Sequence, residues 1–300
     1  MLTFLFWNLG GIPKSVPDKV VRKRETVLKG IVANLTRQHQ VDVLMLAECP
    51  LSGQELVEEL NLQNPKPEPT GFRLPDPRSQ CERVVIFPRF PMRFLKLRRE
   101  STKFTSRFVR LPGREELTLF LVHFASKRYR SDESQRLAVP GFSQEIRLLE
   151  QEAGHGRTLL VGDLNMNPYE LGIVGAEGLN AVMTREIAYL GSRTIDGRDY
   201  PFFYNPMWNH FGDAGHDVHP PGSPEHAPAG TCYYPSAESR WYFWNMFDQV
   251  LLRPTLLPFF KNEAVRILVT DGNTSLLTEK GLPDRRAISD HLPLLFRLNV

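Results

Sequence analysis

TLLVGDLNMN, residues Thr158 to Asn167, joins an apolar run to a polar pair through a single glycine, Gly162. A short apolar run bounded by glycine is typical of a buried strand. Asp163 and Asn165 follow at the predicted strand end, and we expect a tight turn at Gly162 to hold both side chains rigidly. A rigid carboxylate beside a hydrogen-bond donor can orient water against a phosphate. The alternative is an ordinary strand-to-loop turn, where Asp and Asn bond their own backbone.

A second polar group lies near the other end of the chain. Ser289-Asp290-His291 stands directly before the apolar run LPLLF, which we predict to be the last strand. An Asp-His pair at a strand start can transfer protons or bind a metal, although a surface turn can also hold both residues.

Four further apolar runs also carry polar residues. These predicted strands are Thr3 to Leu9 with Asn8, Asp42 to Glu48 with Glu48 at its end, Leu117 to His123 with His123 at its end, and Met246 to Leu252 with Asp248 embedded in it. A carboxylate is costly to bury beside an apolar strand unless it has a cation or another partner. We therefore expect Glu48 and Asp248 each to have a cation or a hydrogen-bond partner, and a divalent metal would supply one.

In chain order these polar residues resemble the motifs of the endonuclease/exonuclease/phosphatase superfamily. The most specific pieces are GDLN at Gly162 to Asn165, FDQVL at Phe247 to Leu251, and SDH at Ser289 to His291. The resemblance spans nearly the whole chain, and we expect one domain over residues 1–300. It implies a four-layer α/β/β/α sandwich of two packed mixed sheets flanked by helices. The residues alone indicate only a mixed α/β class.

The resemblance also implies a metal-dependent phosphodiesterase and a role for each motif residue. Mg²⁺ or Mn²⁺ would be held by Glu48, with Asn8 and Asp290, because hard oxygen ligands select these ions. Whether one or two metal ions bind stays open. The implied catalytic roles are as follows: Asp163 orients or deprotonates water, Asn165 and His123 hold phosphate oxygens, Asp248 fixes the tautomer of His291, and His291 is a phosphate clamp or a proton shuttle.

Departures from the motifs bear on the substrate. Abasic-site endonucleases of the superfamily have an acidic residue where this chain has Gly10 and a tyrosine where it has His123, so the histidine is more similar to the DNase I-like and sphingomyelinase-like branches. Inositol-polyphosphate 5-phosphatases extend GDLN with an aromatic residue and an arginine, whereas this chain continues with Met166 and Asn167. We predict a nuclease acting on DNA or RNA. The alternatives are a hydrolase of phosphoinositides or other small phosphate esters and a non-catalytic nucleic-acid-binding relative.

Charge supports a polyanionic substrate only locally. The chain carries 37 basic and 34 acidic residues, for a net charge of +3. Between Arg83 and Arg114, however, ten basic residues face a single acid, Glu100, and three more basic residues follow His123. Such a stripe suits nucleic-acid phosphates, or it is a solvated face of antiparallel strands. The predicted substrate-binding residues are Arg98, Arg99, Lys103, Lys127 and Arg128.

Three scattered cysteines, Cys49, Cys81 and Cys232, lack CxxC spacing, which argues against a disulfide scaffold or a zinc knuckle. Since the sequence shows neither a signal-peptide pattern nor an apolar run of ~18 residues, we expect a cytoplasmic protein without a membrane span. Predicted helices cover Asp18 to Gln40, a segment starting at Ser52, and Ser143 to Glu152. The segment 196–240, rich in Pro, Gly, aromatic residues and histidines, predicts a long loop of unassigned role.

Overall fold

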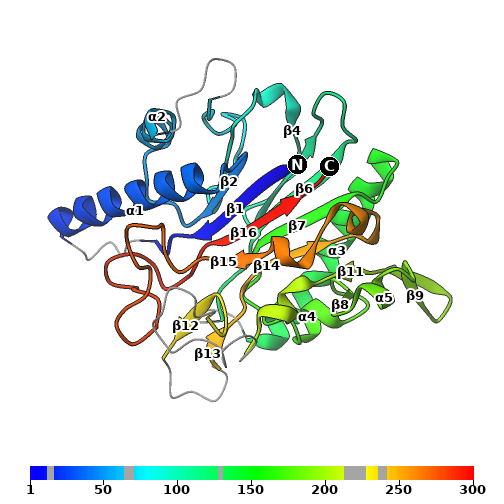
Figure 1. The fold of residues 1–300 in the computed structure, drawn as a ribbon. Coiled ribbons are helices and arrows are strands. Elements are labelled where there is room, and N and C mark those ends of the chain that lie inside the picture. Colours follow the sequence, from blue (N-terminus) through cyan, green and yellow to red (C-terminus); the bar gives the residue numbers. More distant parts are fainter. Residues whose placement is uncertain (12–16, 64–70, 128–130, 213–227, 236–241) are drawn as a thin grey trace.

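Two large mixed sheets form the centre of the structure, as Figure 1 shows. The computed structural model describes residues 1–11, 17–63, 71–127, 131–212, 228–235 and 242–300. Within these residues, the first sheet has the order β15-β16-β1-β2-β3, with β1 Leu2–Asn8, β2 Val43–Ala47, β3 Val84–Pro88, β15 Arg266–Ile267 and β16 Leu294–Leu298. The second has the order β4-β5-β6-β7-β14-β11-β8, with β4 Leu95–Glu100, β5 Phe104–Val109, β6 Leu117–His123, β7 Thr158–Asp163, β8 Ala181–Val182, β11 Phe203–Tyr204 and β14 Asp248–Leu252.

The strand sequences are continuous apolar runs, because both faces of each sheet are covered by other parts of the protein. In β1, Phe4 and Phe6 point into the core between the sheets and belong to one buried cluster with Leu119 of β6. Leu5 and Trp7, on the opposite face of β1, pack under a helix. Alternate residues of a strand point to opposite faces, so a strand buried on both sides needs apolar residues at every position.

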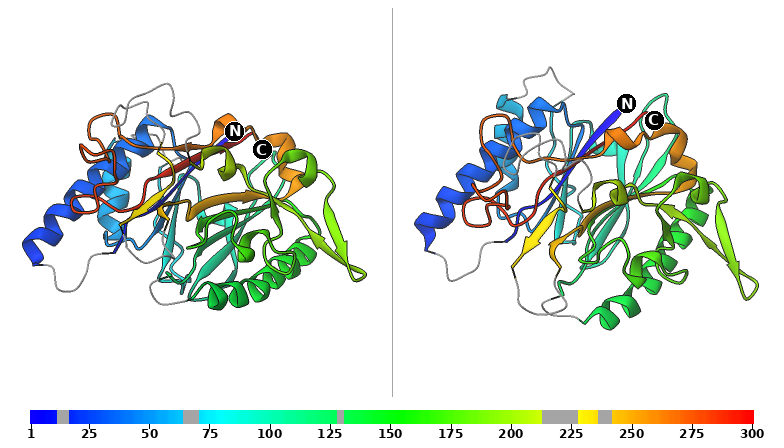
Figure 2. Two further views of the ribbon diagram at one scale, coloured as in Figure 1. Left: turned by 90° about the horizontal axis from the view of Figure 1, so that it is seen from below. Right: turned by 60° about the horizontal axis from the view of Figure 1, so that its bottom comes forward.

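Helices cover the outer faces of the two sheets (Figure 2). The described helices are α1 Asp18–Gln38, α2 Gly53–Gln63, α3 Asp132–Ala153, α4 Leu171–Val174 and α5 Arg185–Ala188, with 3-10 turns at Met92–Phe94, Pro206–His210, Pro254–Phe259 and Asn262–Ala264. Leu28, Val32 and Leu35 of α1 pack on the first sheet, and Ile146 and Leu149 of α3 pack on the second. This arrangement confirms the predicted four-layer α/β/β/α sandwich.

The third helix is longer than the sequence predicts. It begins at Asp132, because the Ser131 side chain accepts a hydrogen bond from the Ser134 N–H and caps the helix. Pro140 therefore lies inside α3, where a proline removes one helical hydrogen bond. Val139 and Phe142 are both buried on either side of it, so packing on the second sheet holds the helix through this position.

Two other expectations about local structure are wrong. Gly162 is not in a turn but inside β7. Its φ is +146°, and a Cβ there would lie 2.0 Å from the Val122 carbonyl oxygen of β6, so this strand position requires glycine. Asp248 is not embedded in a strand but is the first residue of β14. Met246 and Phe247 precede that strand and are buried.

The segment 196–240 is not a structureless loop in its described parts. It contains β10 Arg198–Pro201, which pairs with β9 Ser192–Ile195, and it also contains β11 and the 3-10 turn at Pro206–His210. β12 Cys232–Tyr234 pairs with β13 Phe243–Asn245. Of the histidines in this segment, three lie outside the described residues: His216, His219 and His226. The remaining one, His210, is in the 3-10 turn and has a pKa lowered by burial.

All three cysteines are free thiols. Burial raises the pKa of Cys49 to about 11, and a protonated thiol is a poor nucleophile. Among the described helices, none combines the length and the apolar character that crossing a membrane requires.

Acid is expected to destabilise the fold partly through His39, at the end of α1. Burial, followed by the charges of Arg266 and Arg297, lowers the pKa of His39 to about 4 from an ordinary 6.5. Between these two pKa values the unfolded chain binds more protons than the native one. The contribution of His39 to the free energy of unfolding is therefore fully present above pH 6.5 and is lost as the pH falls toward 4. In urea unfolding at pH 7.5 and 5, His39→Gln should lose less stability than the parent. An equal loss in both proteins would contradict this assignment.

Candidate active site

Three polar residues stand in one row across the second sheet, where neighbouring strands end together. In the register of the sheet, His123 of β6 pairs with Asp163 of β7, and Asp163 pairs with Asp248 of β14. All three are buried, with relative exposures of 5%, 1% and 0%. The row follows from the register alone, because residues paired across adjacent strands lie side by side.

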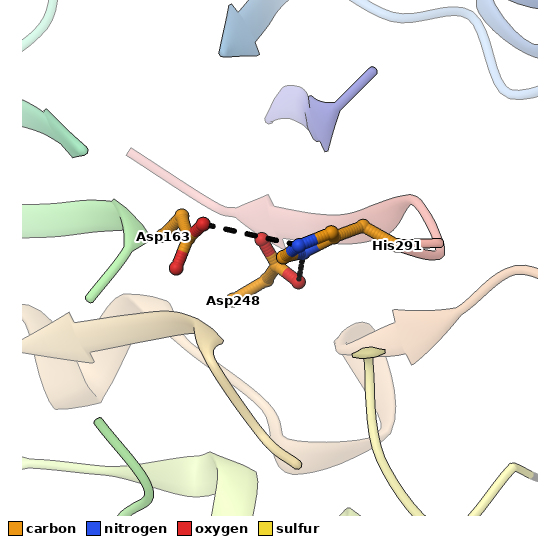
Figure 3. A group of neighbouring side chains, drawn as sticks. All are labelled: Asp163, Asp248 and His291. Atoms are coloured by element: carbon orange, nitrogen blue, oxygen red, sulfur yellow. Dashed lines mark hydrogen bonds and ion pairs between the residues drawn. The ribbon is translucent and has the colours of Figure 1, made fainter. Parts of the chain in front are cut away.

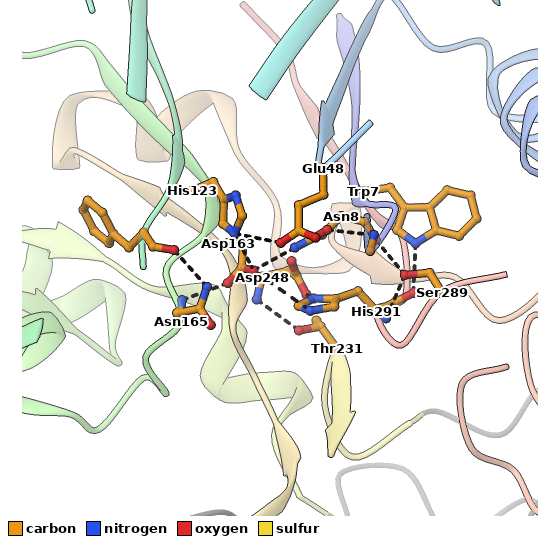
Figure 4. A network of polar contacts seen from close by, with 12 residues as sticks. Trp7, Asn8, Glu48, His123, Asp163, Asn165, Thr231, Asp248, Ser289 and His291 are labelled. Carbon is orange, nitrogen blue, oxygen red and sulfur yellow. Dashed lines mark hydrogen bonds and ion pairs between the residues drawn. The ribbon is translucent and has the colours of Figure 1, made fainter. Parts of the chain in front are cut away.

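The first sheet supplies the opposite side of the site (Figure 4). Asn8 ends β1, and Glu48 directly follows β2, which runs parallel to β1. The segment Ser289 to His291 precedes β16, which is antiparallel to β1, so it returns to the same end of the sheet. Ser289 Oγ donates to the Asn8 carbonyl oxygen at 2.8 Å, and Trp7 Nε1 donates to the His291 carbonyl oxygen at 2.9 Å. These two hydrogen bonds tie the segment to the end of β1.

Asp163 lies at the centre of the site. Its Oδ2 accepts a hydrogen bond from Asn8 Nδ2 at 2.9 Å and lies 3.6 Å from His123 Nε2 and 4.0 Å from His291 Nε2. Its Oδ1 accepts from the Asn165 backbone N–H at 2.8 Å. Groups from both sheets therefore converge on one buried carboxylate, and its orientation is fixed from four directions.

Asp248 and His291 form a buried pair beside Asp163 (Figure 3). Asp248 Oδ2 lies 2.7 Å from His291 Nδ1, and the Asp248 backbone N–H donates to Thr231 Oγ1 at 3.0 Å. Burial is the largest single influence and would lower the pKa of His291. The charge of Asp248 and the neighbouring Cys232, with the hydrogen bonds to both side chains, together outweigh it and raise that pKa well above its ordinary value. The pair therefore holds the imidazole in one orientation and favours its protonated form.

Glu48 and Asn165 hold their side chains with strained backbones. Both have positive φ, 46° and 49°, a region that costs energy for residues other than glycine. Glu48 Oε2 accepts from the Gly11 N–H at 2.7 Å, while Oε1 lies 3.3 Å from His123 Nε2. Asn165 Nδ2 donates to the Phe124 carbonyl oxygen at 3.1 Å. Such strain is typical of sites where the side-chain direction matters.

Most of these side chains line a cavity of about 300 Å³, although His123 and Asp248 are not among its lining residues. Its lining includes Asn8, Glu48, Asp163, Asn165, Asp290 and His291, together with Gly10, Gly11, Arg24, Ser126, Cys232, Tyr234, Phe247 and Arg285. Gly10 has φ +58°, a conformation that favours glycine, and a Cβ there would lie 2.9 Å from Asp290 Oδ1, so the Asp290 carboxylate would have to shift. The glycine that departs from the abasic-site endonuclease pattern therefore lies directly beside the Asp290 carboxylate.

The structure brings together the predicted catalytic and metal-binding residues, but not the predicted substrate-binding stripe. Arg99 pairs with Glu145 and Glu152 of α3, and Lys127 Nζ lies 2.6 Å from Glu170 Oε2. The remaining members are placed as follows: Arg98 over the Phe108 ring, Lys103 beside a separate cavity of about 80 Å³, and Arg128 outside the described residues. Their part in substrate binding stays a prediction.

Arg24 and Arg285, which line the cavity, were missed by the sequence analysis. Arg24 lies on α1, whose amphipathic pattern indicates a helix but not which polar residue points toward the site. Arg285 follows no motif. The sequence analysis also missed that Ser289 and Thr231 hydrogen-bond to the backbone of site residues. Ser289 could have been found, because it lies within the SDH motif.

The donor atoms around the cavity suit a divalent cation. Four carboxylates gather here, and like charges in one site repel unless a cation balances them. Asp163, Asp248 and His291 each offer one ligand atom within 4.8 Å of the others. Asp248 Oδ1 is buried and has no hydrogen-bond partner among the described residues. The carboxylate and amide oxygens of Glu48, Asp290 and Asn8 adjoin the same space.

Comparisons with known proteins agree with this geometry. A model described as the Endonuclease/Exonuclease/phosphatase family matches residues 5–291. No curated protein matches the chain.

Among solved structures, truncated TDP2 of Caenorhabditis elegans matches with 13% identity and a TM-score of 0.52, covering 99% of this chain and 97% of that one. A family protein from Bacteroides thetaiotaomicron matches with 11% identity and a TM-score of 0.51, covering 99% of this chain and 98% of that one. One from Leptotrichia buccalis matches with 12% identity and a TM-score of 0.51, covering 100% of both chains. At such identities the likeness concerns the fold.

Proposed function

Because this chain belongs to the endonuclease/exonuclease/phosphatase family, we propose that it is a metal-dependent phosphodiesterase whose substrate is DNA or RNA. One observation carries the proposal: Asn8, Glu48, Asp163 and His291, from both sheets and the segment before β16, meet at one cavity. A phosphate diester carries negative charge, and its hydrolysis breaks a P–O bond and expels an alkoxide. The reaction therefore needs an oriented water and groups that stabilise charge on the phosphoryl oxygens. The cavity offers candidates for both.

Asp163 is the proposed general base. It is the buried carboxylate on which the hydrogen-bond donors of the site converge, so it can orient and deprotonate an attacking water. Asn165 and His123, on either side of it in the site, can hold phosphoryl oxygens. His291, kept protonated and oriented by Asp248, can clamp the phosphate or give a proton to the leaving oxygen.

Glu48, Asp290 and Asn8 are the proposed metal ligands. When bound there, Mg²⁺ or Mn²⁺ would supply positive charge that offsets the developing charge on the phosphoryl group. Asn8 Nδ2 donates to Asp163 and Asn8 Oδ1 accepts from the Gly10 N–H, so the amide of this proposed ligand is already oriented beside the proposed base. Asn8 thus connects the two functions of the site.

A substrate panel with and without divalent ions tests the proposal. Purified protein with Mg²⁺ should nick plasmid DNA or cut a single-stranded oligonucleotide or RNA, EDTA should abolish cleavage, and added Mg²⁺ or Mn²⁺ should restore it. Cleavage undiminished by EDTA would contradict the proposed requirement for a metal ion. Release of inorganic phosphate from phosphoinositides, with every polynucleotide untouched, would instead support a small-ester hydrolase. Tight DNA binding without turnover under any ion would indicate a binding protein.

A further inference from the structure

The cavity lining carries charges of both signs. The carboxylates are Glu48, Asp163 and Asp290, and two arginines, Arg24 and Arg285, contribute the guanidinium groups of the described lining. Burial lowers the pKa of Arg24, and the charges of Asp290 and Glu48 partly offset this effect. Neither arginine has a part in the chemistry proposed above. A cavity that acts on a single phosphate does not need two further cations at its edge, so their presence requires an explanation.

Arg24 is fixed against the backbone of the site. Its Nη2 donates to the carbonyl oxygens of Leu9, Gly10 and Ile288 at 2.8, 2.6 and 2.8 Å, and its Nε donates to Ile288 at 3.0 Å. These carbonyls belong to the segment after Asn8 and the segment before Asp290. Its Nη1 has no hydrogen-bond partner among the described residues. The guanidinium is therefore held in one position with one donor nitrogen left over.

Arg285 has a fixed backbone and an unpaired side chain. Its N–H donates to the Pro283 carbonyl oxygen at 2.9 Å, and the following turn is held by Asp284 Oδ1, which accepts from the backbone N–H groups of Arg286 and Ala287. The side chain is exposed, and within the described part of the chain no carboxylate pairs with it. An arginine anchored in this way at the edge of a cavity can form a bidentate contact with a phosphate.

From these contacts we infer that Arg24 and Arg285 form a second anion subsite, which binds the phosphate next to the scissile one in a polynucleotide. The inference rests on the proposed function and specifies the substrate of that site as a chain of phosphates. It also locates the backbone of the substrate on the side of α1 and the segment before β16. The predicted basic stripe differs, since Arg99 and Lys127 are already paired with carboxylates.

The test compares Arg285→Ala with Arg286→Ala on substrates that differ by one phosphate. Arg286 is the adjacent exposed arginine and does not line the cavity, so it is a matched control for net charge. The substrates are a dinucleoside monophosphate and the same compound with one extra phosphate at its 5′ or its 3′ end. For one of the two extended compounds, Arg285→Ala should raise KM roughly tenfold with kcat little changed. The unextended compound and the Arg286→Ala variant should show no such change.

Binding measurements separate this inference from the proposed function. If no compound is hydrolysed, fluorescence anisotropy of a labelled oligonucleotide should still show weaker binding for Arg285→Ala than for Arg286→Ala, with a shallower salt dependence. Equal effects of the two variants, or equal loss with and without the extra phosphate, would overturn the subsite. The assignment to a polynucleotide would be overturned if a small alcohol bisphosphate displaced the labelled oligonucleotide in a way that Arg285→Ala weakens, while the extended dinucleotides did not displace it.

Discussion

Asp163→Asn is expected to lower kcat by about 10²- to 10⁴-fold, the usual contribution of a positioned general base. The variant keeps the size of the side chain and removes the charge on which Asn8, His123 and the Asn165 N–H converge. Steady-state cleavage of the best substrate of the panel, at saturating Mg²⁺, is the measurement. Activity within tenfold of the parent would show that another group activates the water.

Asp271→Asn is a matched control for the loss of a buried carboxylate. Asp271 is 4% exposed and accepts hydrogen bonds from Asn34 Nδ2 and from the N–H groups of Asn273 and Thr274, outside the active-site cavity. Its substitution should reduce stability while leaving kcat unchanged, because the lost hydrogen bonds hold a loop and not the site. If both variants lost activity equally, the effect of Asp163→Asn would reflect general damage.

Gly162→Ala is expected to destabilise the fold by about 3 kcal/mol or more. The added methyl group would lie 2.0 Å from the Val122 carbonyl oxygen and 2.8 Å from its carbon, and neither strand backbone can move without breaking the pairing of β6 with β7. The φ of +146° adds strain, because only glycine adopts it readily. Urea unfolding followed by circular dichroism measures the loss.

Gly30→Ala provides the opposite expectation in the same assay. Gly30 lies inside α1, and a Cβ there meets no atom within 4 Å. Alanine should therefore stabilise the protein by roughly 0.5–1 kcal/mol through its higher helix propensity. A Gly162→Ala variant as stable as Gly30→Ala would mean that β6 and β7 do not approach each other as closely as the structure shows.

The strands and most of the site could be predicted because their signals are local. An apolar run ending in Asp163 or His123 is visible in ten residues, and burial on both faces leaves few other readings of such a run. The position of Asp248 was less predictable, since Met246 and Phe247 continue the apolar pattern although they precede β14. Burial alone does not separate a strand from the buried segment before it.

Features that depend on distant parts of the chain could not be predicted. Gly162 looks like a turn residue, and the reason for its presence is the carbonyl oxygen of Val122 on another strand. Pro140 resembles a helix boundary, and only the packing of α3 on the second sheet carries the helix past it. Arg24 is one polar residue of an amphipathic helix until the carbonyls of Leu9 and Ile288 are placed beside it.

The site is divided between two sheets, and within the described residues no strand of one sheet pairs with a strand of the other. Asp163 and Asp248 belong to one sheet, Asn8 ends a strand of the other, and Glu48 directly follows one. Packed side chains and a few polar contacts, such as Asn8 Nδ2 to Asp163 Oδ2, keep the two layers in register. A sideways slip of one layer by the width of a methyl group would separate base from ligands while both layers stayed intact. Substitutions deep in the interlayer core, far from any reacting atom, thus influence turnover through alignment.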